Sequence, residues 1–291
     1  MSKIPSLVSS SWLAGNLSGS DLRILDATVQ ITPTFQVSSG RKDWELAHVP
    51  GAAHADLLAL SDPSAPPFMF RMPSIERFAA FMGELGIGDG TRVVLYDARE
   101  NMWAARLWWM LRSAGFDDAG ILDGGWTTWR LENRPTCAVP CRYPPASFTP
   151  RPRAGIIVDK HEVLAAMRDP DTRIVSALGK RSHRGDINEY GRPGHIPGAA
   201  NVSAWTLIDR ATQRYRPEAE LRTLFGSLLG ATRVITYCGG GIASSSDAFV
   251  LHLLGHPNVA VYMGGLLEWC ADPAMPMELG TGATNAGLAR A

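Results

Sequence analysis

One cysteine lies among glycines between two segments of regular structure, and its surroundings favour nucleophilic sulfur chemistry. Cys238 follows the β-favouring residues 234–237 and precedes three consecutive glycines. Because glycine adopts backbone conformations closed to other residues, such a loop can turn several N–H groups toward one atom. These donors, with the N-terminus of a following helix, favour the thiolate and would also hold a persulfide or an oxyanion. The expected cradle consists of Gly239, Gly240, Gly241, Ile242, Ala243 and Ser244.

The alternative interpretation of Cys238 is a buried structural cysteine at a strand end, beside a flexible turn. Packing alone does not explain three glycines there, because each costs conformational entropy and buries no side chain. The flanking pattern predicts a short buried strand over residues 234–237 and an amphipathic helix that begins near Ser244. We therefore expect Cys238 to be the catalytic nucleophile.

The composition is that of a globular protein without a strong electrostatic field. The chain has 291 residues, of which 45% are hydrophobic, and 28 Lys and Arg balance 28 Asp and Glu. This length accommodates one large domain or two ordinary ones. A net charge of zero, without a basic stripe, argues against a nucleic-acid or membrane-surface partner. No stretch has a signal-peptide core or membrane-spanning length, so we expect a cytoplasmic protein.

The cysteines indicate neither a disulfide framework nor a zinc site. The sequence has no Cys-x-x-Cys motif and no pair of histidines at metal-binding spacing. A reducing compartment without a bound metal therefore fits the cysteine pattern best. The four cysteines are Cys137, Cys141, Cys238 and Cys270.

The two halves of the chain repeat the same landmarks. A His-x-Pro-Gly-Ala-Ala turn at residues 48–53 occurs again at 195–200, a separation of 195 − 48 = 147 residues. An apolar strand ends at Asp97 in the first half and at Cys238 in the second, a separation of 238 − 97 = 141 residues. Because the landmarks recur in the same order at nearly one spacing, they indicate a duplicated domain, that is, a tandem repeat.

Each copy alternates short apolar strands with helices, which is typical of a mostly parallel α/β sheet with helices on both faces. A third landmark, the glycine pair at 124–125, recurs at 264–265. Between the copies, several prolines disfavour both helix and central strand, so that segment is expected to be an extended linker. The predicted boundaries are 1–138 for the first domain, 139–153 for the linker, 154–280 for the second domain and 281–291 for a tail.

Several motifs in this one chain match a known family. They are the two His-x-Pro-Gly-Ala turns, the run 104–109 followed by Asp-Gly-Gly-Trp at 123–126, and the Cys-Gly-x-Gly loop at 238–241. Over residues 8–278 this combination resembles the two-domain rhodaneses, which are thiosulfate and 3-mercaptopyruvate sulfurtransferases. The resemblance implies two tandem rhodanese-like domains, of which the first, with Asp97 in place of the cysteine, is catalytically inactive.

The resemblance also implies a reaction in two halves. Cys238 would take the sulfane sulfur of thiosulfate or 3-mercaptopyruvate as a persulfide and pass it to a thiophilic acceptor. The expected partners are thus a small anionic sulfur donor and an acceptor that is cyanide or a thiol, a protein thiol included. Neither a metal nor an organic cofactor is required, and no nucleic acid or membrane takes part.

An anionic donor needs a cation near the loop. In the family, arginines between the first strand of the second domain and its His-x-Pro-Gly turn help to bind the donor. That segment offers Arg181, Arg184 and Arg192 here. We favour Arg184, which precedes a glycine, and Arg192, which lies three residues before His195. The alternative interpretation is that these arginines are solvated loop charges.

Two other functions compete with sulfur transfer by a small-molecule enzyme. A cysteine-dependent phosphatase needs Cys-x5-Arg, so that an arginine binds two phosphate oxygens; Ser244 occupies that position here. The second rival is a protein-directed sulfur carrier, or a non-catalytic module that binds an anion or persulfide. A loop without side chains that would hold a specific small donor favours this rival over the phosphatase.

Overall fold

The structure, a computed structural model, describes residues 3–32, 36–66 and 69–281. The chain divides into two units: unit 1 comprises Met1–Arg153 and Asp209–Tyr215, and unit 2 comprises Ala154–Ile208 and Arg216–Ala291. Each unit is an α/β domain on a five-stranded parallel sheet, which confirms the predicted fold class. The predicted tail lies outside the described residues, except for Thr281.

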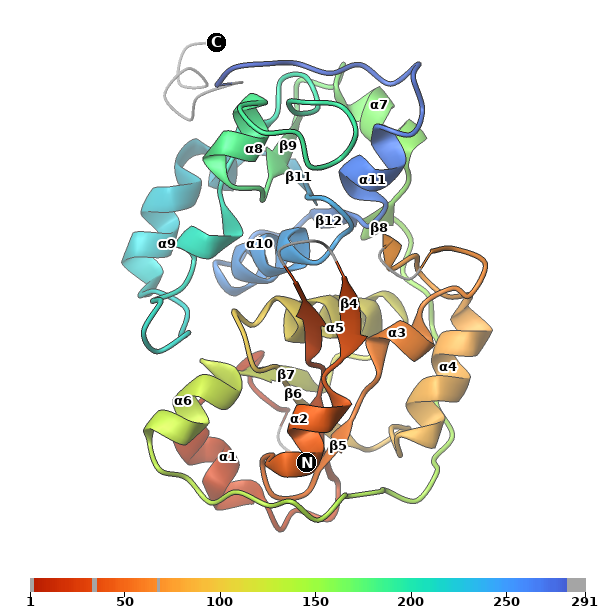
Figure 1. Cartoon of the computed structure of the whole chain (residues 1–291), viewed down its shortest axis with the longest axis vertical. Helices are drawn as coiled ribbons and strands as arrows, with labels where there is room; N and C mark the ends of the chain where they lie inside the picture. The colour runs from red at the N-terminus through yellow and green to blue at the C-terminus, as the bar shows by residue number, and fades with distance from the viewer. Residues whose placement is uncertain (1–2, 33–35, 67–68, 282–291) are drawn as a thin grey trace. The chain divides into compact units, whose positions relative to one another are not determined.

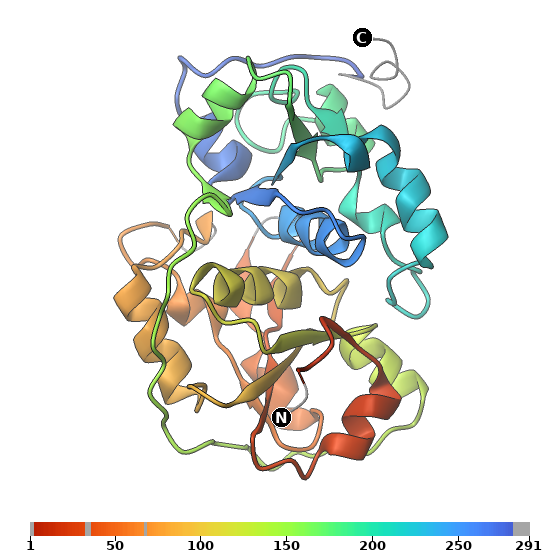
Figure 2. The ribbon, with the colours of Figure 1, turned by 180° about the vertical axis from the view of Figure 1, so that it is seen from behind.

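Unit 1 alternates strands with helices. Its strands are β1 (Leu7–Val8), β2 (Leu22–Asp26), β3 (Val29–Ile31), β4 (Val37–Ser39), β5 (Ala52–His54), β6 (Arg92–Tyr96) and β7 (Ala119–Leu122). Its helices are α1 (Ser10–Asn16), α2 (Arg41–Leu46), α3 (Leu57–Leu60), α4 (Ile75–Glu84), α5 (Met102–Ser113) and α6 (Gly125–Leu131). The main sheet has the order β1-β7-β6-β2-β5, while β3 and β4 form an antiparallel ribbon. Helix α5 covers one face of the main sheet, and α1 and α6 cover the other (Figures 1 and 2).

Unit 2 repeats this plan. Its strands are β8 (Ile157–Val158), β9 (Thr172–Ser176), β10 (Ala200–Asn201), β11 (Arg233–Tyr237) and β12 (Val259–Tyr262). Its helices are α7 (Lys160–Ala166), α8 (Lys180–Arg184), α9 (Glu218–Phe225), α10 (Ala243–Leu253) and α11 (Gly265–Trp269), with 3-10 turns at η2 (Ala204–Thr206) and η3 (Gly226–Gly230). The sheet order is β10-β9-β11-β12-β8. Helix α10 covers one face, and α7 and α11 cover the other (Figure 1).

The two sheets are equivalent strand by strand. In chain order, the first, second, third, fourth and fifth strands of each sheet occupy the same positions, so β6 and β11 are the central strands. In both units the helix after the central strand begins six residues beyond the strand end: 102 − 96 = 6 for α5 and 243 − 237 = 6 for α10. This agreement confirms the duplication that the repeated motifs predict.

The apolar residues that define the strands also build the core. In unit 1, Leu13 of α1 and Trp129 of α6 pack with Ile24, Val94 and Tyr96 of the sheet, and all five are nearly inaccessible to solvent. Burial of each such side chain contributes about 1.5–3 kcal/mol. In the described ranges, no helix is long and apolar enough to cross a membrane.

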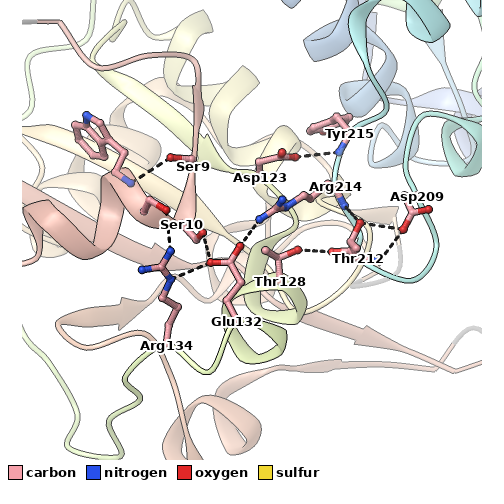
Figure 3. Close-up of polar contacts among 12 residues, drawn as sticks. Ser9, Ser10, Asp123, Thr128, Glu132, Arg134, Asp209, Thr212, Arg214 and Tyr215 are labelled. Atoms are coloured by element: carbon pink, nitrogen blue, oxygen red, sulfur yellow. Dashed lines mark hydrogen bonds and ion pairs between the residues drawn. The ribbon is translucent and has the colours of Figure 1, made fainter.

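One short segment belongs to unit 1 although unit 2 flanks it in sequence. Residues 209–215 lie against Asp123, which follows β7, and against α6 of unit 1 (Figure 3). The Tyr215 N–H donates to Asp123 Oδ1 at 2.9 Å, and Thr128 Oγ1 donates to the Thr212 carbonyl at 2.5 Å. Side chains of unit 1 therefore form hydrogen bonds with backbone groups of this segment.

Glu132 connects the same segment to the start of the chain. Ser10 Oγ donates to Glu132 Oε2 at 2.5 Å, Arg134 Nε donates to the same oxygen at 2.9 Å, and Arg214 pairs with Oε1 (Figure 3). The Ser10 hydrogen bond and then the two arginines lower the pKa of Glu132. The carboxylate is thus ionised and fully partnered at neutral pH.

Two glycines before the second His-x-Pro-Gly turn provide a test of how closely the chain packs around that turn. Gly194 and Gly191 both have positive φ, +103° and +89°, but only Gly194 lies against another segment, where a Cβ would overlap the Glu278 carbonyl. We expect Gly191→Ala to cost about 1–2 kcal/mol of unfolding free energy through backbone strain alone. Gly194→Ala should cost clearly more, because the bridge between His195 and Glu278 must move. Denaturant unfolding measures both, and equal losses would contradict the assigned contact.

Candidate active site

Cys238 lies at the carboxyl end of the central strand of unit 2. Strand β11 pairs in parallel with β9 and β12, and Cys238 is the first residue beyond it. In open parallel sheets this edge is where ligands bind. The Cys238 side chain is nearly buried, with 3% of its surface exposed. The fold therefore delivers one sulfur atom to the functional edge of the sheet.

The loop after Cys238 contains main-chain N–H groups that have no acceptor among the described residues. Gly239, Gly240 and Gly241 are buried, and α10 begins two residues later at Ala243. The N–H groups of Gly239, Gly241 and Ile242 donate to no other described residue. Because the first N–H groups of a helix are also unpaired and carry partial positive charge, the loop is suited to hold an anion.

Within this loop one side chain contacts the sulfur. Ser244, fully buried in the first turn of α10, directs Oγ toward Cys238 Sγ at 3.5 Å. The predicted cradle residues, from Gly239 to Ser244, form one continuous segment directly after Cys238. In the described ranges, no group of three or more His, Cys, Asp or Glu could hold a metal ion.

The repeated glycine pair holds this loop in place. The Leu266 N–H donates to the Cys238 carbonyl at 2.8 Å, and the Leu267 N–H donates to the Gly239 carbonyl at 2.9 Å. Gly265 has φ +56°, and a Cβ there would lie 2.5 Å from the Cys238 carbonyl oxygen. Only glycine permits this backbone contact, which explains why a glycine pair occurs at this point in both copies.

In unit 1 the equivalent cradle is filled by a carboxylate. Asp97 follows β6, and its Oδ1 accepts from the N–H groups of Arg99 at 2.8 Å and Asn101 at 3.2 Å. Its Oδ2 accepts from Trp103 and Ala104, both at 2.9 Å. Burial raises the pKa of Asp97 to about 7, against the opposing effect of these N–H groups. The fold therefore gathers four main-chain donors around the first side chain after the central strand.

The sequence offsets of the four donors from Asp97 predict which residues are their counterparts after Cys238. They lie at 99 − 97 = 2, 101 − 97 = 4, 103 − 97 = 6 and 104 − 97 = 7 residues beyond Asp97. The same offsets from Cys238 give Gly240, Ile242, Ser244 and Ser245, of which the first three belong to the predicted cradle. Ser245 already donates its N–H to the Ile242 carbonyl at 3.1 Å.

The two favoured arginines make no hydrogen bond or ion pair with this loop in the described chain. Arg184 ends α8, and its side chain is exposed. Arg192 donates from Nη1 to the carbonyls of Met275 at 2.7 Å and Asp272 at 3.3 Å. The structure thus gives Arg192 a role in holding the chain after α11 and leaves the Arg184 guanidinium accessible.

Tyr190 is a site residue that the sequence did not indicate. A Cβ on Gly239 would lie 2.7 Å from both Cζ and Oη of Tyr190, so the ring packs directly on the loop. Burial, and then the Cys238 thiolate, raise the pKa of the Tyr190 hydroxyl well above its usual range. No local pattern could have revealed this contact, because 238 − 190 = 48 residues separate Tyr190 from Cys238.

The histidines of the repeated turns fix backbone rather than face the sulfur. His195 is fully buried, its Nδ1 lies 2.8 Å from the His183 carbonyl, and its N–H donates to the Glu278 carbonyl. His48 in unit 1 is placed alike, with Nδ1 at 2.6 Å from the Trp44 carbonyl. Because both copies use the histidine in the same way, its role does not depend on the cysteine.

Comparison with known proteins places the chain in a family. The model of the rhodanese-like domain matches residues 9–132 and again 159–272. The chain belongs to the rhodanese family. Human 3-mercaptopyruvate sulfurtransferase is 31% identical over 96% of this chain and 97% of its own. Rat thiosulfate sulfurtransferase is 31% identical over 90% of this chain and 91% of its own.

Solved structures of similar fold extend the comparison. The anaerobic ergothioneine biosynthesis enzyme from Chlorobium limicola, solved in complex with trimethyl histidine, superposes with a TM-score of 0.82. Its sequence is 25% identical, and the match covers 94% of this chain and 70% of that enzyme. The resemblance drawn from the sequence motifs is thereby confirmed for both domains.

The contact between Gly239 and Tyr190 can be tested by a double-mutant cycle. Gly239→Ala should slow alkylation of Cys238 by iodoacetamide by about tenfold, because the new methyl group displaces the ring and the loop beneath it. Adding Tyr190→Ala should restore most of the rate, since the obstructing ring is gone. Tyr190→Ala alone serves as the control. Additive effects of the two substitutions would show that the ring does not support the loop.

Proposed function

We propose that this rhodanese is a sulfurtransferase that carries sulfane sulfur as a persulfide on Cys238. The observation that carries the proposal is a nearly buried sulfur at the position where unit 1 binds a carboxylate on main-chain N–H groups. It is followed by a loop in which the N–H groups of Gly239, Gly241 and Ile242 donate to no other described residue. The curated relatives that match along nearly the whole chain are thiosulfate and 3-mercaptopyruvate sulfurtransferases, which supports the same reaction.

The first half-reaction forms the persulfide. The Cys238 thiolate attacks the outer sulfur of thiosulfate or the thiol sulfur of 3-mercaptopyruvate, and a new S–S bond forms. With thiosulfate, the original S–S bond breaks and its electron pair leaves on sulfite. With 3-mercaptopyruvate, the C–S bond breaks and the carbon keeps the pair as pyruvate enolate, which then takes a proton. The main-chain donors stabilise the negative persulfide that results.

The second half-reaction returns the enzyme to its starting form. A thiophilic acceptor such as cyanide or a thiolate attacks the outer sulfur, and the S–S bond to Cys238 breaks with its electron pair on Cys238. Because the sulfur resides on the protein between two separate encounters, the kinetics should be of the ping-pong type. No step draws on a metal or an organic cofactor.

Unit 1 has a different role in this scheme. Its cradle already holds the Asp97 carboxylate on four N–H groups, so no donor remains for a second anion. Asp97 also lacks a nucleophilic sulfur. We propose that the first domain, residues 1–138, is the non-catalytic copy and that the second, residues 154–280, carries the reaction.

The acceptor could also be a heteroaromatic molecule. The Chlorobium limicola enzyme of similar fold binds trimethyl histidine, which presents a flat imidazole ring. Tyr190 places an aromatic ring directly on the sulfur loop, and such a ring stacks on a flat acceptor. Trimethyl histidine therefore joins cyanide and a thiol as an acceptor to be tested.

The reaction is tested by sulfur transfer from thiosulfate and from 3-mercaptopyruvate to each acceptor. We expect wild-type turnover with at least one donor, a mass gain of one sulfur atom on Cys238, and loss of both in Cys238→Ser. Cys270→Ser is the matched control, because Cys270 is the other buried thiol of unit 2 and its Sγ lies 3.8 Å from the Arg192 carbonyl and 3.9 Å from Met277 Sδ. Turnover that survives in Cys238→Ser would overturn the proposal.

If no donor turns over but Cys238 gains a sulfur from a sulfur-loaded protein, the chain is a protein-directed carrier rather than a small-molecule enzyme. If Cys238 gains no sulfur from any source, the loop binds anions without catalysis. These two outcomes distinguish a protein-directed sulfur carrier from a module that binds anions without catalysis.

The arginine assignments give a separate prediction. We propose that Arg184 and Arg192 bind the anionic donor, and the exposed Arg184 is the one free to do so directly. Arg184→Ala should raise KM for thiosulfate about tenfold with little change in kcat, and Arg184→Lys should restore part of the affinity. Arg192→Ala should also lower the melting temperature, because the carbonyls of Asp272 and Met275 lose their donor. An unchanged KM in both alanine variants would remove these residues from the site.

A further inference from the structure

Helix α10 buries an acidic side chain that has no partner. Asp247 is fully inaccessible to solvent, and neither of its carboxyl oxygens has a hydrogen-bond partner among the described residues. The four residues after it, 248–251, are apolar and fully buried as well. An isolated carboxylate in such surroundings costs several kcal/mol or more, so a buried acid without a partner is held in its neutral form.

The position of Asp247 on the helix relates it to the sulfur. Asp247 follows Ser244 by three residues, so the two side chains share one face of α10, and helical side chains lean toward the preceding turn. Ser244 Oγ lies 3.5 Å from Cys238 Sγ. Burial raises the pKa of Asp247 well above that of an ordinary aspartate, and the Cys238 thiolate raises it further.

The tyrosines near α10 on the neighbouring strands carry no charge at neutral pH. Tyr237 on β11 and Tyr262 on β12 come from the two strands on which the helix packs, and burial raises both hydroxyl pKa values, so both stay neutral. Tyr190 on the sulfur loop is neutral for the same reason. The turn η2, which also contacts α10, contains only Ala204, Trp205 and Thr206.

Two charged residues of neighbouring elements in unit 2 have hydrogen-bond partners of their own. At the far end of β11, the Arg233 guanidinium donates to the Gly155 carbonyl. Glu268 of α11 accepts from the Tyr262 hydroxyl at 2.7 Å. Burial and Cys238 are the two causes that shift Asp247. Cys238 and Asp247 thus form a pair in which the ionisation of one group opposes the ionisation of the other.

We propose that Asp247 is a positioning residue that sets the charge of the sulfur pocket: it stays protonated while Cys238 is anionic, and its ionisation excludes anionic sulfur donors. The inference rests on the proposed role of Cys238 as the sulfur carrier. When hydroxide removes the Asp247 proton, the pocket gains a second negative charge at short range in a poorly screened interior. Thiosulfate, itself a dianion, would then be repelled, whereas a neutral reagent would not.

Alkylation of Cys238 by two reagents of different charge tests this directly. Iodoacetate carries one negative charge and iodoacetamide none, so the ratio of their rate constants at Cys238, followed by peptide mass spectrometry, reports the charge of the pocket. In the wild type this ratio should fall by about tenfold toward alkaline pH as Asp247 ionises. In Asp247→Asn, which keeps the shape but cannot ionise, the ratio should stay constant.

A matched control uses another buried acid. Burial also raises the pKa of Asp26 in unit 1, but the other groups that act on it are Thr28, Tyr96 and His48 rather than Cys238. Asp26→Asn should therefore reproduce the wild-type fall. A constant ratio in the wild type, or the same fall in Asp247→Asn, would overturn the proposal. If Asp247 served packing alone, Asp247→Asn would show the same pH dependence of the ratio as the wild type.

A second measurement does not depend on the folding of Asp247→Asn. The infrared carbonyl band of a protonated, unbonded carboxylic acid can be followed with pH in the wild type and in Cys238→Ser. We expect the Asp247 band to persist to higher pH in the wild type, because the Cys238 anion is absent from the serine variant. Disappearance at the same pH in both proteins would refute the coupling. Neither measurement uses a sulfur donor, so absence of sulfur transfer would overturn the proposed function and leave this result standing.

Discussion

A buried negative charge at the carboxyl end of a central parallel strand must be met by main-chain N–H groups, and both units are organised around this requirement. The charge belongs to the first side chain after the strand, and four residues separate that side chain from the start of the following helix. In unit 1 the arrangement is complete, because the Asp97 carboxylate uses four donors. In unit 2 a cysteine sulfur occupies the same place, and Ser244 Oγ from the following helix lies 3.5 Å from it.

The rest of each domain supports that short loop. The parallel sheet fixes where the strand ends, and the helix that follows contributes its unpaired first turn. A glycine with positive φ then brings a second segment against the loop: the Trp126 N–H donates to the Asp97 carbonyl in unit 1, and the Leu266 N–H donates to the Cys238 carbonyl in unit 2. Duplication has preserved this backbone frame while the side chain at its centre differs, because the frame binds an anion without depending on which atom carries it.

Two buried acids show how the same burial can have different consequences. Asp97 is surrounded by donors, so its anionic form is supported and its pKa rises only to about 7. Asp247 has no hydrogen-bond partner in the described chain, and burial and Cys238 both raise its pKa, so its neutral form prevails. A neutral acid beside the sulfur leaves the loop dipoles and the helix terminus to act on the persulfide alone.

The sequence by itself determined the duplicated α/β fold, the strand before Cys238 and the approximate start of α10, because periodicity, glycine runs and repeated motifs act locally along the chain. It also indicated the donor cup, since three glycines between a strand and a helix have few other uses. Only the tertiary structure decided that Tyr190 packs on Gly239, that Arg192 is engaged by distant carbonyls, and that Asp247 is buried without a partner. These properties depend on which segments meet in space, and residues such as Tyr190 and Cys238, far apart in sequence, leave no shared pattern from which that contact could be read.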